Sequence, residues 1–211
     1  MKLIPVHYKI SKPVKSYKEI AKEAEELKEY IVNGKYEGLY NKAFAIAHNQ
    51  VSYNPMAFFV VSPDVIAENM FESQVIINPE IVEAEKTREL VREGTGQTIL
   101  VSNVRQMKDA CMSFAFREPK NVNRFDKIKV KYQIKGFWGL KTVIRELEGM
   151  ASQIFQHETD HINAKNVYFE SENPEKWWEM IGREKSKGGT SLDNPDKAGI
   201  KRAKDVVRHL W

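Results

Sequence analysis

The sequence predicts an α+β fold in which mixed or antiparallel β-sheets pack around a central helix. Two observations support this prediction. Short runs of β-prone residues follow one another along the middle of the chain, separated by turn residues rather than by helices, which favours antiparallel pairing over a doubly wound sheet. A later segment, residues 149–163, carries its apolar and histidine side chains at helical spacing.

Composition excludes several classes of protein. The 211 residues suit one domain of ordinary size, and 42% hydrophobic with 29% charged residues exclude wholesale disorder and a fibrous repeat. No apolar run reaches the ~18 residues of a membrane-spanning helix, and the N-terminus lacks the apolar core of a secretory signal. A net charge of +4 does not by itself indicate nucleic-acid binding. The single cysteine excludes an internal disulfide and favours a cytoplasmic location.

The first predicted element is an amphipathic helix over residues 17–32. Ser16 and Glu19 have the spacing of a capping box at its start, and Gly34 belongs to a typical stop signal. Lysine and glutamate side chains separate the apolar residues of one face, which recur at helical spacing: Ile20, Ala24, Leu27 and Ile31.

Strands are predicted in the middle of the chain. Residues 57–61 are apolar and lie between two prolines, and residues 74–78 form a second run that we expect to end at Pro79. Residues 127–133 alternate between polar and apolar side chains, as a half-buried strand does. Two weaker candidates complete the set: residues 98–101 and 141–144.

The predicted helix at residues 149–163 contains the pattern His-Glu-x-x-His. His157 and His161 lie one helical turn apart, so both imidazoles face the same side and can bind one metal ion. Glu158 lies beside them, where it can accept a proton from a metal-activated water molecule. Two further residues share the stripe of the histidines: Met150 and Ile154.

Two histidines leave such an ion short of one protein ligand. Cys111 stands out because the chain has no other cysteine. An isolated cysteine is more often a small buried apolar residue, but beside a His-Glu-x-x-His helix a thiolate ligand for iron or zinc is favoured. The remaining candidates are a carboxylate or one of the other histidines: His7, His48 and His209. Of these, His48 is interpreted as a hydrogen-bonded structural residue.

Three segments together resemble the motifs of peptide deformylases. Residues 43–50 (AFAIAHNQ) are similar to a G-x-G-Φ-A-A-x-Q segment, residues 109–113 (DACMS) to E-G-C-L-S, and residues 156–161 (QHETDH) to Q-H-E-x-D-H. Residues 77–81 (INPEI) resemble a strand of that family, and residues 122–124 (VNR) resemble its V-x-R turn. The elements also occur in the family's order, and the resemblance covers residues 5 to 170.

The resemblance implies a peptide-deformylase-like fold around a central metal-binding helix. The implied activity is that of a metal-dependent hydrolase, which removes the formyl group from the N-terminal formyl-methionine of newly made proteins. Cys111, His157 and His161 are the implied metal ligands. Iron(II) is the implied working ion, with zinc, nickel or cobalt able to replace it.

The resemblance also assigns roles around the metal. Glu158 would move the proton, while the Gln50 side chain and the Met112 backbone N–H would stabilise the oxyanion. The substrate would lie against a further set of residues: Ala45, Ala110, Arg124, Met150 and Ile154.

Several residues depart from the family pattern. Alanines replace both glycines of the first motif, and Asp109 replaces the glutamate of the second. Gln153 stands where deformylases usually have an apolar pocket residue. The segment between Pro79 and Cys111 is long for the family, which predicts an inserted loop or hairpin near the mouth of the active site.

Three other functions compete with this one. The first is a related formyl- or acyl-amide hydrolase with altered specificity, and the second is a non-catalytic deformylase-like protein. The third is a zincin-type endoprotease, whose third ligand usually lies downstream of the motif, where His209 is the sole histidine. Asp160 likewise has two interpretations, an ion pair with Arg124 or a solvated helix acid.

The chain is expected to have two parts, a catalytic domain over residues 1–170 and a C-terminal extension over residues 171–211. The extension contains a Gly/Ser-rich linker and a basic helix over residues 195–210. This helix either docks on the ribosome by attraction to phosphates, as in some deformylases, or packs its apolar stripe on the enzyme's own surface. The expected partners are nascent formyl-methionyl peptides and, in the first case, the ribosome; no membrane partner is expected.

Overall fold

A computed structural model describes residue 3 and residues 9–34, 42–114 and 118–168. No helix in these ranges is both long and apolar enough to cross a bilayer. The elements of the described part are, in chain order, α1 (Tyr17–Asn33), β1 (Ala45–Ala47), η1 (His48–Gln50), β2 (Phe58–Val61), α2 (Pro63–Ala67), β3 (Val75–Glu83), β4 (Thr87–Val91), β5 (Thr98–Ser102), β6 (Val104–Asp109), η2 (Met112–Phe114), β7 (Lys120–Phe125), β8 (Lys127–Lys135), β9 (Leu140–Glu148) and α3 (Gly149–Ile162).

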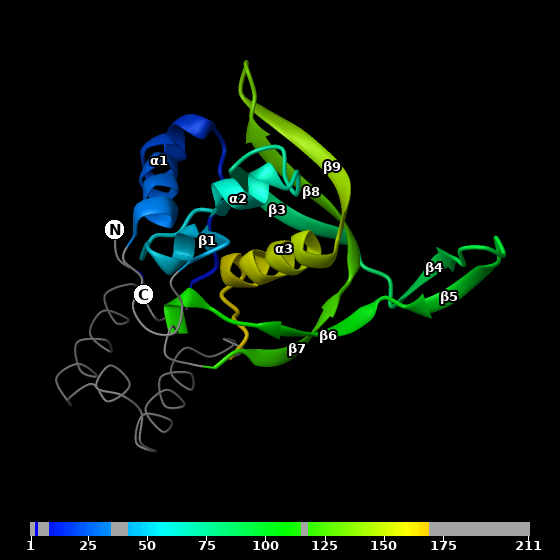
Figure 1. The fold of residues 1–211 in the computed structure, drawn as a ribbon. Coiled ribbons are helices and arrows are strands. Elements are labelled where there is room, and N and C mark those ends of the chain that lie inside the picture. The colour runs from blue at the N-terminus through cyan, green and yellow to red at the C-terminus, as the bar shows by residue number, and fades with distance from the viewer. Residues whose placement is uncertain (1–2, 4–8, 35–41, 115–117, 169–211) are drawn as a thin grey trace. The chain divides into compact units, whose positions relative to one another are not determined.

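The named strands form one sheet and two ribbons, and every pair among them is antiparallel. Strands β1, β2, β3, β8 and β9 make up the sheet in that order. Strands β4 and β5 form one separate ribbon, and β6 and β7 form another. Figure 1 shows α3 between the five-stranded sheet and the β6–β7 ribbon. The prediction of an α+β fold with antiparallel sheets around a central helix is therefore confirmed.

The five-stranded sheet separates two apolar cores, and its strand β2 is therefore buried on both faces. Successive side chains of a strand point to opposite faces, so Phe59 packs in the core of α3 and Phe58 in the core of α1. Phe155 of α3 is fully buried in the first core. Burying each side chain of this size contributes about 1.5–3 kcal/mol. The second core contains the predicted stripe of α1: Ile20, Ala24, Leu27 and Ile31.

The ends of α1 agree only in part with the sequence. Ser16 is the residue before the first turn, but its side chain makes no capping hydrogen bond. The Glu19 carboxylate instead accepts a hydrogen bond of 3.0 Å from the backbone N–H of Lys15. The predicted capping box is therefore wrong, because the glutamate reaches one residue further back. At the other end, the Gly34 N–H donates to the Tyr30 carbonyl at 2.8 Å, which confirms the predicted stop.

Strand β3 continues past Pro79, so the prediction that it ends there is wrong. Its pairing with β8 shifts register between Ile77 and Glu80, and Asn78 has a φ of 48°. At such a bulge the missing N–H of proline costs no ladder bond. The Asn78 side chain holds the bulge in place by donating to the Val14 carbonyl at 2.7 Å.

The segment between Pro79 and Cys111, for which an inserted loop or hairpin is predicted, contains a hairpin formed by β4 and β5. Residues 122–124, which resemble a turn of the family, lie instead within β7, because β7 pairs with β6 along its whole length. The predicted helix over residues 195–210, the linker before it and the domain boundary at residue 170 lie outside the described residues.

Candidate metal centre

Helix α3 is held in one orientation by polar bonds to the end of β7. It begins at Gly149, whose φ of 59° would strain a residue with a side chain. The Ser152 hydroxyl and the Gln156 amide both donate to the Phe125 carbonyl, at 2.7 and 2.8 Å. The Gln156 oxygen in turn accepts from the Phe125 N–H at 3.0 Å. These bonds fix the rotation of the helix about its axis, and with it the direction of its histidines.

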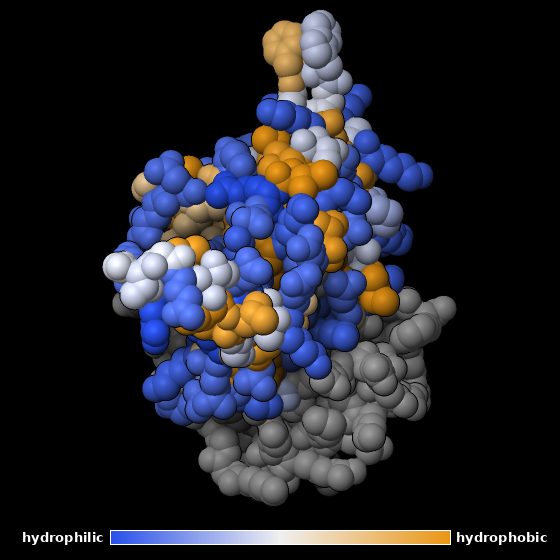
Figure 2. All heavy atoms as spheres, turned by 90° about the vertical axis from the view of Figure 1, so that its right-hand side faces the viewer, coloured by the Kyte–Doolittle hydropathy of each residue, from blue (hydrophilic) through white to orange (hydrophobic). Residues whose placement is uncertain are grey.

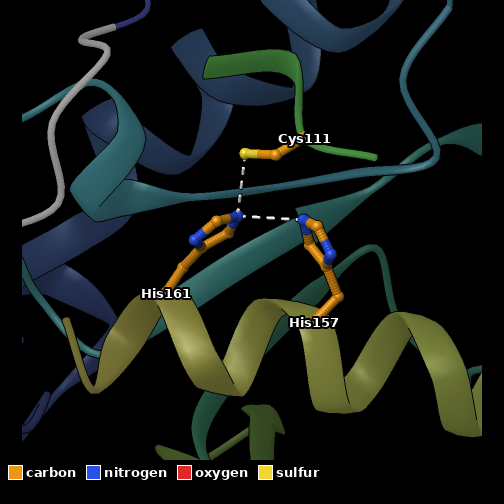
Figure 3. Close-up of side chains that lie close together, drawn as sticks. All are labelled: Cys111, His157 and His161. Carbon is orange, nitrogen blue, oxygen red and sulfur yellow. Dashed lines mark hydrogen bonds between the residues drawn. The ribbon is translucent and has the colours of Figure 1, made fainter. Parts of the chain in front are cut away.

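Three buried side chains converge on one point above α3, as Figure 3 shows. The Nε2 atoms of His157 and His161 are 2.9 Å apart. The Sγ atom of Cys111, which follows β6, lies 3.3 Å from Nε2 of His161. All three ligand atoms lie within 4.8 Å of one another. The structure thus brings together the three residues predicted as metal ligands.

The outer nitrogen of each histidine has its own acceptor. Nδ1 of His157 lies 2.8 Å from a carboxylate oxygen of Asp109, and Nδ1 of His161 lies 3.1 Å from the Lys165 carbonyl oxygen. These oxygens accept hydrogen bonds, so each Nδ1 carries a proton, and the Nε2 atom of each neutral ring is left to bind a metal ion. Such outer partners orient the ligands of metal sites.

The donor set fits a divalent transition metal. Two nitrogen lone pairs and a sulfur facing one another repel unless a metal ion or a proton lies between them. One thiolate and two neutral imidazoles suit zinc or iron(II). Three protein ligands also leave a coordination position open, which is typical of a catalytic rather than a structural site.

Glu158 lies next to the first histidine and is buried. Burial disfavours the charged carboxylate and raises the pKa of Glu158 to about 7, although the neighbouring His157 opposes this shift. Its Oε2 atom has no hydrogen-bond partner among the described residues. A buried carboxylate with a pKa near neutrality can both accept and return a proton.

Gln50 is positioned by the short helical turn η1. The side-chain oxygen of Gln50 accepts a hydrogen bond of 2.8 Å from the Ala47 backbone N–H. This leaves the amide nitrogen facing the metal ligands, 3.7 Å from Cys111 Sγ and 3.2 Å from the Ser113 hydroxyl. A hydrogen-bond donor is therefore fixed beside the candidate metal centre.

An ion-pair network supports the first histidine from behind. Arg124 donates to Asp109 at 2.9 Å and to Asp160 at 2.5 Å, which confirms the pairing of Asp160 with Arg124 over a solvated helix acid. Burial tends to raise the pKa of Asp109, but His157 and Arg124 outweigh it and lower the pKa below its ordinary value. Asp109 is therefore a charged acceptor for the His157 N–H.

A cavity of about 320 Å³ opens beside the metal centre. Of the predicted catalytic residues, Gln50, Met112 and Glu158 line it. Arg124, predicted to touch substrate, does not line it and lies in the ion-pair network. The other residues predicted to touch substrate all line it: Ala45, Ala110, Met150 and Ile154.

Other candidates of the sequence lie elsewhere. No residue of the β4–β5 hairpin lines the cavity, although the insertion was expected near its mouth. His48 is buried, accepts a hydrogen bond of 2.9 Å from the Met56 N–H and stacks on Phe58, which confirms its structural interpretation. Burial lowers the pKa of His48 to about 4. His7 and His209 lie outside the described residues.

Sequence reasoning missed the contact of Asp109 with His157. A signal exists, because an acidic residue two positions before a candidate cysteine ligand suits the carboxylate–histidine pattern of metal sites. It also missed two lysines that line the cavity, Lys42 and Lys108. Neither lies in a motif, so no pattern in the sequence points to them.

Comparison with known proteins places these observations in a family. The model of the polypeptide deformylase family matches residues 4–177. A peptide deformylase of Thermotoga maritima is 38% identical over 91 residues, which cover 42% of this chain and 42% of the relative. The match thus spans less than half the length of that curated relative.

Solved structures show the same fold. The crystal structure of the Thermotoga maritima peptide deformylase has a TM-score of 0.53 at 27% identity, covering 79% of this chain and 93% of the other. A peptide deformylase from the Vibrio parahaemolyticus bacteriophage VP16T, solved with actinonin, has a TM-score of 0.56 at 16% identity, covering 79% and 100%. The likeness to the phage protein concerns the fold alone.

Proposed function

We propose, from the premise that the chain belongs to the peptide deformylase family, that it removes the formyl group from the N-terminal formyl-methionine of newly made proteins. One observation carries the proposal. Cys111, His157 and His161 converge on a single point, and the cavity beside it is lined by Glu158. A cytoplasmic location, where newly made chains carry the formyl group, accompanies this proposal.

The chain's own groups suit hydrolysis of a small amide. A divalent ion held by the three ligands would lower the pKa of a water molecule and polarise the formyl carbonyl. Glu158 accepts the proton of the attacking water and then gives it to the leaving amine. The Gln50 amide and the Met112 backbone N–H donate to the oxyanion as the carbonyl carbon becomes tetrahedral. Formate and a free N-terminus result.

Iron(II) is the ion that we propose as native. A thiolate with two imidazoles binds iron(II), zinc, nickel and cobalt, so the choice rests on the family resemblance rather than on geometry. Reconstitution of the metal-free protein with each ion in turn, under anaerobic conditions, tests it. The proposal is rejected if the zinc form is as active as the iron form and insensitive to oxygen.

The activity is tested by formate release from a formyl-methionyl peptide, with metal content measured on the same sample. An acetyl-methionyl peptide of the same sequence is the matched control. Formate from the first peptide and no acetate from the second supports a deformylase. Full metal occupancy without formate release would overturn the proposal.

A second candidate is a related amide hydrolase with an altered side-chain preference. Gln153 lines the cavity, and its amide donates to the Lys108 carbonyl at 2.8 Å. The polar Gln153 side chain suits a polar side chain of the substrate, whereas an apolar residue at this position, as the family resemblance leads one to expect, suits an apolar substrate side chain. Comparing formyl-methionyl and formyl-glutaminyl peptides on the parent and on Gln153→Leu separates the two candidates. An unchanged ratio of kcat/KM between the two enzymes rejects the second.

We further propose that the basic segment over residues 195–210 docks the enzyme on the ribosome. The proposal rests on its charge, since cationic side chains bind nucleic-acid phosphates. Replacing Lys201, Arg202 and Lys204 by glutamine should weaken salt-dependent co-sedimentation with ribosomes. Formate release from a short peptide should stay unchanged. Undiminished co-sedimentation of this variant rejects docking.

A further inference from the structure

The β4–β5 hairpin stands apart as a ribbon of two strands whose outer edges pair with no other strand among the described residues. Figure 1 shows it extending away from α3 and the sheet. Its base is clamped by Asn103, whose amide donates to the Glu85 and Lys127 carbonyls at 2.7 and 2.8 Å. The Asn103 N–H also donates to the Lys86 carbonyl at 2.8 Å. The ribbon is thus a firmly attached arm rather than a loose loop.

The two edges of the arm differ in charge. Strand β4 and the turn after it carry two cations and two anions: Arg88, Glu89, Arg92 and Glu93. Strand β5 has no charged side chain, and none occurs between Gly94 and Val104. Charged side chains are a usual protection of a sheet edge against pairing with another chain. Arg88 is held by Asp126 and Glu148 at the base of the arm, but Glu89, Arg92 and Glu93 give the β4 edge this protection. The β5 edge lacks it.

The backbone of β5 presents free hydrogen-bonding groups on its outer edge. The Arg92 N–H donates to the Gln97 carbonyl, and hydrogen-bonded pairs alternate along an antiparallel ladder. Ile99 and Val101 therefore turn their N–H and C=O groups toward β4. The next residues turn theirs outward: Thr98, Leu100 and Ser102.

The side chains of β5 are also suited to a partner. Leu100 is 72% exposed, more than any other apolar residue of the arm. Figure 2 looks onto this side of the molecule and shows apolar side chains at the surface among charged ones. An exposed, uncharged strand rich in β-branched residues favours addition of a further strand.

We propose that β5 is a self-association surface, through which two copies of this chain pair their β5 strands antiparallel about a two-fold axis at Leu100. In this register Leu100 lies opposite Leu100 of the second copy, and Thr98 lies opposite Ser102. Thr98, Leu100 and Ser102 are the residues whose backbone N–H and C=O groups point outward, so each of these pairs forms backbone hydrogen bonds between the two copies. Ile99 lies opposite Val101 on the other face, and no charge enters the interface.

The same symmetry does not work for β4. A two-fold axis perpendicular to the ribbon leaves each face of the ribbon on the same side in both copies. Two residues that lie opposite each other must therefore belong to the same face, so their numbers differ by an even number. An axis at Glu89 places that carboxylate opposite its own copy. An axis at Leu90 places Arg92 opposite Arg88, whose side chain is already held by Asp126 and Glu148, and an axis at Val91 places Glu89 opposite Glu93. Like charges directly opposite one another destabilise a strand pair, so self-pairing is confined to β5.

No residue of the arm lines the cavity, so the proposed pairing edge is separate from the candidate active site. Failure of this inference therefore leaves the proposed function untouched. The arm joins two copies into a four-stranded ribbon, which gives the strands the partners that an isolated hairpin lacks.

Sedimentation velocity of the full chain between ~1 and ~100 μM tests the inference, with dimers expected to increase with concentration. Leu100→Lys should raise the dimer dissociation constant at least about tenfold, since it places like charges on the axis. Val91→Lys is the matched control, because Val91 is 60% exposed on the protected edge of the same arm. Circular dichroism of both variants checks that they fold.

Cross-linking tests the register itself. Hydrogen-bonded antiparallel residues have Cα atoms about 5.5 Å apart, which a disulfide can span. Leu100→Cys should therefore link to its own copy on mild oxidation, whereas Val91→Cys and the parent, whose Cys111 is buried, should not. Equal cross-linking of the two variants overturns the inference. So does a parent chain that stays monomeric throughout, which would leave the β5 edge to a strand of another protein.

Discussion

Replacing Arg124 by methionine tests how the β6–β7 ribbon is held against α3. The guanidinium joins Asp109 of the ribbon to Asp160 of the helix, and its side chain is 10% exposed. Methionine keeps much of the buried length but removes the charge and every hydrogen bond. The substitution leaves Asp109, whose side chain is 6% exposed, with a hydrogen bond to the His157 imidazole and without the charge of Arg124.

The expected loss of unfolding free energy is large. Removing one partner of a buried ion pair costs about 3–5 kcal/mol because the other charge stays buried. Asp160 is partly exposed and can be solvated by water, so it adds little. The matched control is Arg105→Met, since Arg105 is 57% exposed and pairs with Asp126 at 3.2 Å. Asp126 is buried but keeps its pair with Arg88 at 2.7 Å, so loss of the exposed Arg105 should cost only about 0–1 kcal/mol.

Urea unfolding at pH 7, followed by circular dichroism, measures both variants against the parent. Adding Asp109→Asn to Arg124→Met should recover part of the loss, because the buried charge without a partner is then gone. Equal stability of Arg124→Met and Arg105→Met would refute the reasoning. A double variant less stable than Arg124→Met alone would contradict it too.

Three further predictions concern catalysis, metal and acid stability. Glu158→Gln should keep its metal, measured by elemental analysis, while kcat falls by about 10²–10⁴; retained turnover would exclude Glu158 as the proton carrier. Cys111→Ala should bind metal more weakly, so the rise of Tm on adding zinc should shrink; an unchanged rise would remove Cys111 from the ligands. Tyr132→Phe removes a donor to Glu72. Partial burial tends to raise the pKa of Glu72, but hydrogen bonds from Tyr132 and the charge of Arg145 lower it below 4.5. The resulting stability is present above pH 4.5 and is lost as the pH falls through the folded pKa. The variant should therefore begin to unfold at a higher pH than the parent in an acid titration, and an unchanged midpoint would contradict this.

Two of the three described α-helices, α1 and α3, were predictable because their signals are local, whereas the five-residue α2 was not predicted. Four apolar residues at helical spacing define α1, and the His-Glu-x-x-His pattern marks α3. Strands β6 and β7 left no such signal. Their residues are mostly polar and half-buried or exposed, and the strands exist because they pair with each other. The extension of β3 past Pro79 depends on a bulge fixed by Asn78, a contact between distant segments.

The same distinction applies to the site. His157, Glu158 and His161 lie within one helical turn, so their cooperation can be predicted from spacing alone. The contact between Asp109 and His157 joins residues 48 positions apart. Only the pairing of β6 with β7 and the docking of that ribbon on α3 brings them together, and the sequence has no periodicity that encodes either.

The β6–β7 ribbon is attached to α3 mainly by polar bonds rather than by an apolar core. Regions with few buried apolar contacts open at a lower free energy than the whole protein. The ribbon leads directly to Cys111, so a local opening that leaves both apolar cores folded would separate the thiol from the histidines. Inactivation by mild denaturant should then precede loss of secondary structure. In hydrogen exchange, the paired amides of β6 and β7 should lose protection well before those of β2.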